Sequence, residues 1–232
     1  MKHKKEVKRA YFMDDNSLIA LVKEKLVALR ADLAELFGYA ITTAKLDELQ
    51  ANMRTFEDFP DDHQMESIQM GATQRKNAKA ELIREAVASV MLRVQNKFGF
   101  GSARYKSFGT HGLAKRDDAN LMIAALRVVD RATFYLADLA EHGLAMPELD
   151  ALTTHCEEFK LLLIEHNNKI GERSIAQEDR VLMGNALFEL LKKYCRSAKN
   201  HWYTRSEAHY SHYIIYNTPT GKHEEGASEV EE

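Results

Sequence analysis

An internal repeat is the feature of this sequence that most constrains its fold. Residues 46–98 match residues 149–201 without a gap when the first segment is shifted by 103 positions. The matched residues pair Leu46 with Leu149, Leu49 with Leu152, Met53 with Cys156, Phe56 with Phe159, Phe59 with Leu162, Gln74 with Gln177, Val87 with Leu190 and Met91 with Tyr194. Most are apolar and helically spaced, so the repeat indicates a shared core rather than a shared site.

The composition favours long helices. The chain has only three prolines and eleven glycines in 232 residues, whereas strand-rich folds need frequent turns. Apolar residues make up 45 % of the sequence, which is enough for a sizeable core. We therefore predict an all-α fold of about six helices, in two pseudo-repeated three-helix units that form one antiparallel bundle. The net charge of -3 neither favours nor excludes nucleic acid.

Apolar spacing and breakers predict the helices and the division of the chain. In the first copy we expect helices over about 17–37, from Thr43 to Pro60, and over 72–97. In the second copy we expect helices over about 119–142, 147–169 and 174–204, with breaks at Asn167, Asn168 and Gly171. The predicted segments are a flexible basic arm (1–16), a first repeat (17–98), a Gly-rich connector (99–117), a second repeat (118–208) and a C-terminal tail (209–232).

The C-terminal tail combines an aromatic strap with an acidic end that we expect to be disordered. The strap could pack along the bundle or contact a partner. Its candidate partner-binding residues are Tyr210, Tyr213, Ile214, Ile215 and Tyr216. The N-terminal arm is basic, with Lys2, Lys4, Lys5, Lys8 and Arg9. Both ends are typical of solvated termini.

Targeting signals and cysteine usage predict a cytoplasmic protein. No apolar segment follows the basic start, and no apolar run approaches the roughly 20 residues of a membrane span, so we expect neither a secretory signal nor a membrane partner. Cys156 and Cys195 have no metal-like spacing and fall among apolar helix positions. We interpret them as reduced core thiols.

Short motifs in the first copy give a family resemblance. They are Leu46-Asp47-Glu48-Leu49, then Phe56, then Ala72-Thr73-Gln74-Arg75-Lys76-Asn77-Ala78. The stretch 43–94 thereby resembles a helical module of uncharacterised bacterial proteins, mostly from the Bacteroidota. The second copy keeps Pro147, Leu149, Leu152 and Phe159 but lacks the Lys-Asn-Ala signature. The resemblance implies a helical repeat and supplies no activity.

Catalytic and metal motifs are sparse. A pattern of some all-α RNases, an Arg separated by four to six residues from a following His, occurs for example at Arg196–His201 and Arg104–His111. With ten histidines in the chain, roughly two such matches arise by chance. No Glu-x-x-His pair, nucleophile elbow or phosphate-binding glycine loop occurs. We therefore predict no catalytic, cofactor or metal residues.

Two groups of basic and aromatic residues are candidates for nucleic-acid binding. Such mixtures are typical of single-strand binding surfaces, although cations also favour helix C-termini. The candidates are Arg104 and Lys106 in the connector, and Lys192, Arg196, Lys199, Trp202 and Arg205 near the last helix.

Three functional hypotheses follow. The first is a non-enzymatic scaffold or adaptor that binds another protein or itself, as a homo-oligomer. The alternative is a nucleic-acid-binding helical protein, and the third is an RNase that uses Arg196 and His201. For the first hypothesis, we expect deletion of residues 209–232 to leave a folded protein without its association.

Overall fold

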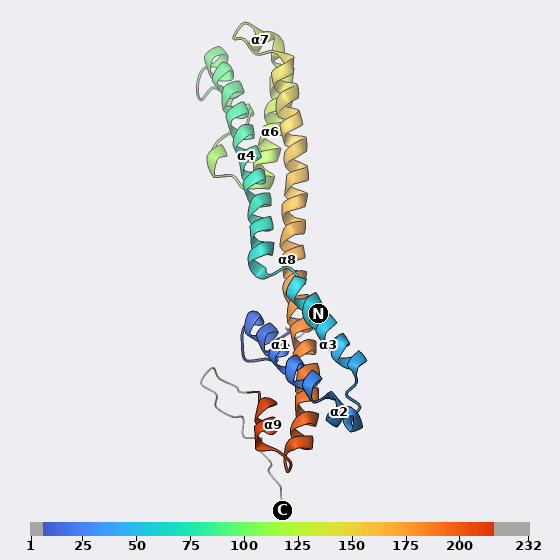
Figure 1. Ribbon diagram of the computed structural model, residues 1–232. Coiled ribbons are helices and arrows are strands. Elements are labelled where there is room, and N and C mark those ends of the chain that lie inside the picture. The colour runs from blue at the N-terminus through green and yellow to red at the C-terminus, as the bar shows by residue number, and fades with distance from the viewer. Residues whose placement is uncertain (1–6, 216–232) are drawn as a thin grey trace, which may run out of the picture. The chain divides into compact units, whose positions relative to one another are not determined.

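The computed structural model describes residues 7–215, and they form an all-α fold without strands. The helices are α1 (Asp15–Ala31), α2 (Leu33–Leu36), α3 (Thr43–Asp58), α4 (Asp62–Phe98), α5 (Ala103–Ser107), α6 (Asp118–Phe134), α7 (Leu136–Ala140), α8 (Met146–Trp202) and α9 (Glu207–His212) (Figure 1). Short 3-10 turns follow α2 at Phe37–Tyr39 and precede α6 at Leu113–Lys115. The predicted all-α class is confirmed.

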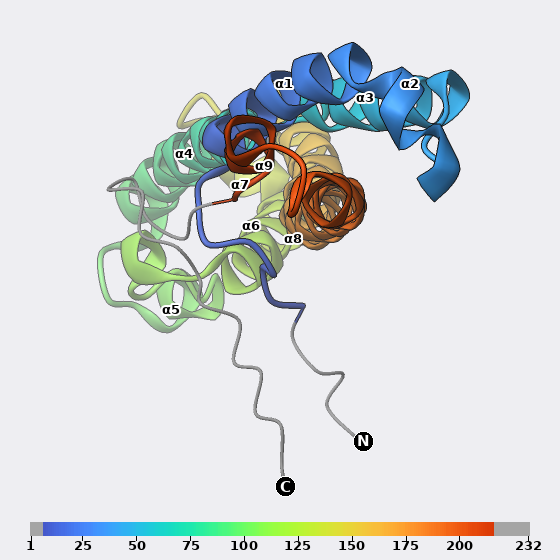
Figure 2. The ribbon, with the colours of Figure 1, turned by 60° about the horizontal axis from the view of Figure 1, so that its bottom comes forward.

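Unit 1 is the first of two compact units, and it joins the two ends of the chain. It takes its described residues from Met1–Asp62 and Ser174–Glu232. In it α1 lies alongside α3, and α9 lies beside the C-terminal part of α8 (Figure 2). Its core includes Leu18, Val22, Leu29, Leu36, Ile41, Leu46, Leu49, Met53, Phe56, Leu187, Phe188, Leu191, Tyr194, Cys195, Ala198 and Tyr213.

Unit 2 consists of His63–Arg173. It contains nearly all of α4, together with α5, α6, α7 and the N-terminal part of α8. Its core includes Ile83, Val87, Val90, Met91, Val94, Phe108, Leu121, Ala125, Val128, Ala132, Leu139, Leu144, Leu149, Leu152, Cys156 and Phe159. Each unit therefore has its own apolar core, built from three long helical segments.

The predicted breaks in the second copy are wrong. Asn167, Asn168 and Gly171 lie inside α8, which is continuous from Met146 to Trp202, so Ser174 does not cap a separate helix. In an exposed helix interior, Gly destabilises the helix by only about 1 kcal/mol relative to Ala, and Asn by less. Favourable neighbouring turns can therefore keep the helix continuous. In the first copy, Pro60 does separate α3 from α4. However, α4 begins at Asp62, ten residues before the expected start, because nothing after Pro60 breaks the helix.

Several structural features correspond between the two predicted copies beyond the gapless sequence match. Asp14 and Asp117 each cap a helix by accepting from a backbone amide three residues on, and they differ by 103 positions. In the third helix the offset is 104, because the second copy has one extra residue between Phe159 and Gly184. This offset pairs the buried positions Ile83 with Leu187, Val87 with Leu191, Val90 with Tyr194, Met91 with Cys195 and Val94 with Ala198.

The same offset extends the repeat into the predicted connector. Ser102 caps α5 and Ser206 caps α9, each by accepting from the backbone amide three residues on. Residues 102–107 therefore correspond in position and capping to the segment that begins α9.

The compact units do not coincide with the predicted copies 17–98 and 118–208. Unit 1 contains the first two long helices of the first copy, α1 and α3, and the C-terminal part of α8 from the second copy. Unit 2 contains α6 and the N-terminal part of α8, with α4 from the first copy. Each unit is thus completed by the third helix of the other copy. Because a third helix of either copy offers the same apolar pattern, the sequence pattern does not determine where that helix packs.

None of the helices in the described part of the chain is both long and apolar enough to cross a membrane.

Candidate interaction surfaces

A shallow groove between α1 and α3 is a concave surface of unit 1. Its volume is about 430 Å³. The lining residues are Lys23, Leu26, Val27 and Arg30 from α1, and Gln50, Met53, Arg54 and Glu57 from α3. Its apolar part includes Val27, whose side chain is 72 % exposed. The groove can therefore take an apolar group between polar rims.

The charges around this α1–α3 groove are mainly positive. Lys23 forms an ion pair with Glu57 at 2.7 Å, and Arg30 forms one with Asp47, which lies outside the groove. Arg54 forms no ion pair or hydrogen bond within residues 7–215. Because Glu57 and Asp47 neutralise Lys23 and Arg30, Arg54 is the lining cation whose charge is free to attract an acidic ligand.

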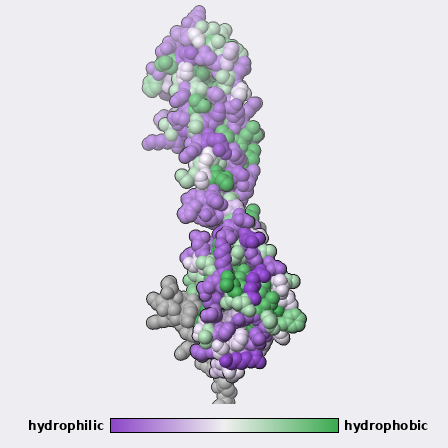
Figure 3. All heavy atoms as spheres, viewed as in Figure 1, coloured by the Kyte–Doolittle hydropathy of each residue, from purple (hydrophilic) through white to green (hydrophobic). Residues whose placement is uncertain are grey.

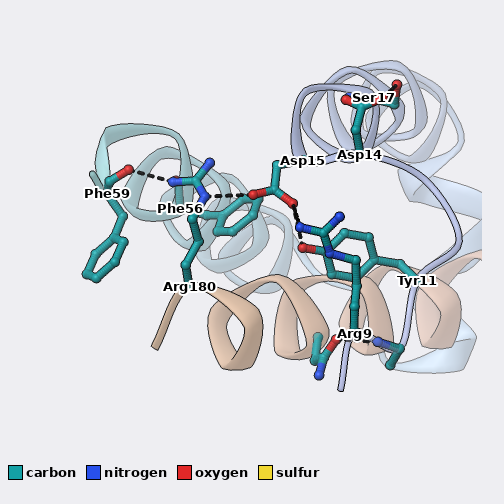
Figure 4. Close-up of polar contacts among 10 residues, drawn as sticks. Arg9, Tyr11, Asp14, Asp15, Ser17, Phe56, Phe59 and Arg180 are labelled. Atoms are coloured by element: carbon teal, nitrogen blue, oxygen red, sulfur yellow. Dashed lines mark hydrogen bonds and ion pairs between the residues drawn. The ribbon is translucent and has the colours of Figure 1, made fainter. Parts of the chain in front are cut away.

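A polar anchor joins the C-terminal part of α8 to α1 and α3 in unit 1 (Figure 4). Arg180 Nε donates to Asp15 Oδ2 at 2.6 Å, and both side chains are mostly buried. Its Nη1 donates to the carbonyl oxygen of Phe59, and its guanidinium lies over the Phe56 ring. The other carboxylate oxygen, Asp15 Oδ1, accepts from the Tyr11 hydroxyl at 2.7 Å. Arg180 thus binds both partner helices at once.

Unit 2 has the equivalent anchor. Lys76 Nζ lies 2.5 Å from Asp118 Oδ2, which joins α4 to the first turn of α6. Lys76 and Arg180 differ by 104 positions, and Asp15 and Asp118 differ by 103. Sequence reasoning missed this pair of anchors. The cation and the carboxylate occupy corresponding positions in both predicted copies, so comparing the copies for matched charged residues could have identified them.

An aromatic cluster covers one end of unit 2. Phe98 packs edge-on to Tyr135, and Arg104 lies over both rings. Phe100 packs against Tyr105, yet its side chain is 77 % exposed. Of the two connector candidates for nucleic-acid binding, Arg104 therefore lies among aromatic rings, and Lys106 is exposed without a partner among the described residues.

The candidates near the end of α8 lie in unit 1 and mostly contact their own chain. Lys192 pairs with Glu189, and Lys199 lies over the Tyr210 ring. Trp202 stacks on His209 with ring centroids 4.2 Å apart. In contrast, Arg196 is exposed and has no partner among the described residues. This end of unit 1 therefore offers fewer free groups than the aromatic cluster of unit 2.

The remaining candidate, Arg205, lies against His201. Its Nη1 is 2.6 Å from both ring nitrogens of His201, which is only 6 % exposed. Glu35 and Tyr39 also approach this ring. The enclosed ring cannot reach a bound RNA, so the arrangement does not support the RNase hypothesis.

The aromatic strap is largely part of the core of unit 1. Tyr213 is 1 % exposed, and its single hydroxyl proton is shared between two acceptors, Asp32 Oδ2 at 2.8 Å and the carbonyl oxygen of Ala28 at 3.0 Å. Burial and the hydrogen bond to Asp32 both raise the pKa of Tyr213. Ile214 is also buried, and Ile215 packs against the same core. Tyr210 is partly exposed, and Tyr216 lies outside the described residues.

The expected result of deleting residues 209–232 changes accordingly. The deletion removes Tyr213 from the core and the partners of Asp32, so it destabilises unit 1 directly. It therefore cannot serve as a test of association alone.

Both cysteines are buried and free. Burial raises the pKa of the Cys156 thiol to about 11 and that of the Cys195 thiol to about 12. Within residues 7–215 there is no group of three or more His, Cys, Asp or Glu side chains that could hold a metal ion.

Comparisons with models of known families, with curated proteins and with solved structures find no match for this chain.

Proposed function

We propose that this protein is a non-enzymatic helical scaffold that binds an acidic, apolar segment of a partner protein in the α1–α3 groove. The proposal rests on one observation: the groove places an exposed apolar side chain, Val27, near Arg54, a cation that has no partner among the described residues. The partner belongs to another protein or to a second copy of the chain. A cytoplasmic setting and a bacterial source are part of this proposal.

The character of the surface supports this choice. Hydrophobic side chains lie among hydrophilic ones on the face in view (Figure 3). Charges flanking an apolar strip set the partner and its orientation, while the strip supplies binding energy. An amphipathic helix with Leu on one face and Glu on its flanks fits this pattern.

Binding of a synthetic peptide with these properties tests the proposal by fluorescence anisotropy. We expect Arg54→Glu to weaken binding roughly tenfold, which corresponds to about 1.4 kcal/mol, and Val27→Glu to weaken it further. Arg196→Glu is the matched control, because it makes the same charge change at another exposed site in unit 1. Equal losses in the Arg54 and Arg196 variants would indicate general charge attraction and contradict the groove as the site.

Nucleic-acid binding is the second candidate function, and the aromatic cluster of unit 2 favours it. Phe100 is available for stacking, and Arg104 and Lys106 supply cations beside it. Base stacking on aromatic rings next to cations binds single strands with little sequence preference.

Titration with a labelled oligothymidine tests this second function. We expect binding that weakens steeply with salt and is reduced by Phe100→Ala and Arg104→Glu. Lys160→Glu, at an exposed position of α8 in the same unit, controls for net charge. Affinity that does not depend on salt, or that survives both substitutions in the cluster, would exclude this function.

A further inference from the structure

Unit 1 is held together by contacts between two segments that are far apart in the sequence. Residues 7–62 supply α1 and α3, and residues 174–215 supply the end of α8 and α9. The intervening 63–173 forms unit 2. The two segments of unit 1 are thus joined to each other only through unit 2, and their packing is an association of two separate surfaces.

The contacts between these segments are extensive. Arg180 binds Asp15 and the Phe59 carbonyl oxygen, and Asn185 bonds to the backbone of Lys8 and Ala10. The core side chains of α8 pack between those of α1 and α3. Any chain that presents the same α8 surface can make the same contacts.

The link that follows α3 has the properties of a hinge. Only Phe59, Pro60 and Asp61 separate α3 from α4, and Phe59 has an extended backbone with φ -72° and ψ 134°. Proline favours this conformation in the residue before it and cannot continue a helix. The corresponding part of the second copy lies inside α8, so only one of the two repeats has this hinge.

From these observations we infer that a second copy of this chain can complete unit 1. In the resulting dimer, residues 7–58 of each chain pack on the α8 and α9 surface of the other. The contacts are those of the closed unit, so the balance between closed and exchanged forms depends on the hinge and on concentration. The inference concerns unit 1 alone and does not depend on a ligand in the α1–α3 groove.

Charge complementation between chains tests the exchange. Asp15→Arg and Arg180→Asp are made on separate chains of full length with different tags. Either variant alone places like charges at its anchor, in the closed form and in a homodimer. Mixing the two restores an Asp–Arg pair at both anchors only if the chains exchange. We expect native mass spectrometry of the mixture, refolded together, to show a 1:1 heterodimer.

The double variant Asp15→Arg with Arg180→Asp is the control, because its pair is restored within one chain. We expect it to form less dimer than the mixture does. If the mixture contains only the forms that each variant shows alone, and no heterodimer, the inference is overturned. If the heterodimer forms but the peptide does not bind in the α1–α3 groove, the result would contradict only the proposed function.

A second measurement covers the case in which the single variants do not fold. Ala10→Cys and Asn185→Cys are placed on separate chains, since Asn185 Oδ1 accepts from the Ala10 amide at 2.6 Å and both residues lie near the surface. After mixing and refolding, a short bis-maleimide linker should join one chain of each kind. The control is an Ala10→Cys chain mixed with an Arg196→Cys chain. If the Ala10→Cys and Asn185→Cys chains are linked no more than this control pair, the inference is also overturned.

Discussion

At the residue scale, Gly184 of α8 packs tightly against Tyr11. A Cβ atom at Gly184 would lie 2.5 Å from the Tyr11 hydroxyl oxygen and 2.8 Å from the nearest ring carbon. The corresponding residue in unit 2 is Ala80, which is buried without such a constraint. Glycine is therefore required because the tyrosine ring, fixed by its hydrogen bond to Asp15, occupies the space of a methyl group.

Gly184→Ala is expected to destabilise the protein by about 1–3 kcal/mol, because overpacking displaces Tyr11 and weakens its bond to Asp15. Chemical denaturation followed by circular dichroism measures the change. In the double variant with Tyr11→Ala, the added methyl group should cost much less. An unchanged midpoint for Gly184→Ala in the wild-type background would show that this packing is not tight.

The two thiols give a second prediction at this scale. Because burial raises the pKa of Cys156 to about 11 and that of Cys195 to about 12, both remain protonated at pH 8. The thiolate is the nucleophile, so iodoacetamide should modify neither residue in the folded protein and both after unfolding in urea. Mass spectrometry counts the added groups. Rapid modification of either residue without urea would contradict the structure around that residue.

At the element scale, α8 passes through an exposed glycine. A Cβ atom at Gly171 would meet no heavy atom within 4 Å. Gly171→Ala should therefore stabilise the protein by about 0.5–1 kcal/mol, because alanine loses less backbone entropy on entering a helix. Thermal unfolding measures whether the melting temperature rises. Gly184→Ala, on the same helix, is the comparison, because it should lower the melting temperature. A lower melting temperature for Gly171→Ala would indicate that α8 is not helical at this point.

The short helix α9 brings Tyr213 into the core. Tyr213→Ala should cost about 3–5 kcal/mol, as is typical of a buried aromatic ring, whereas Tyr213→Phe loses only the bonds to Asp32 and the Ala28 carbonyl and should cost about 1 kcal/mol. Urea unfolding separates the two values. Similar small losses for both variants would contradict the burial of the ring.

At the scale of the whole molecule, the chain forms two cores, and a single fluorescent residue can report on the unfolding of one of them. Trp202 is the only tryptophan in the sequence, and it packs against the core of unit 1. Phe56 and Phe159 occupy corresponding positions in the two copies and are fully buried in units 1 and 2. Substituting each phenylalanine in turn therefore tests which core the tryptophan fluorescence reports on.

Phe56→Ala should lower the midpoint of the tryptophan fluorescence transition more than Phe159→Ala does, because only the first substitution opens a cavity in the core that Trp202 contacts. Circular dichroism at the helical minimum, which follows both units, should register a loss in both variants. Equal shifts of the fluorescence midpoint would show that the two cores unfold together.

Sequence reasoning identified most of the core because apolar spacing survives in any arrangement of helices. Leu46, Leu49, Met53 and Phe56 are buried as expected, and so are Ile83 and Val87 of α4. The gapless match pairs Val87 with Leu190, which is only partly buried, whereas Leu191 is fully buried, because one extra residue shifts the register. The groove residues Val27 and Arg54 gave no signal, since a groove exists only where two helices pack.

The sequence by itself determined that this protein is helical, because side-chain periodicity and capping residues act over a few neighbouring positions. Only the tertiary structure decided that each third helix packs with the other copy. The apolar stripes of α4 and of the end of α8 are alike, so local pattern does not distinguish the two pairings. The structure places nearly all of α4 in unit 2 and the end of α8 in unit 1, with residues 59–61 between α3 and α4 and no break in α8.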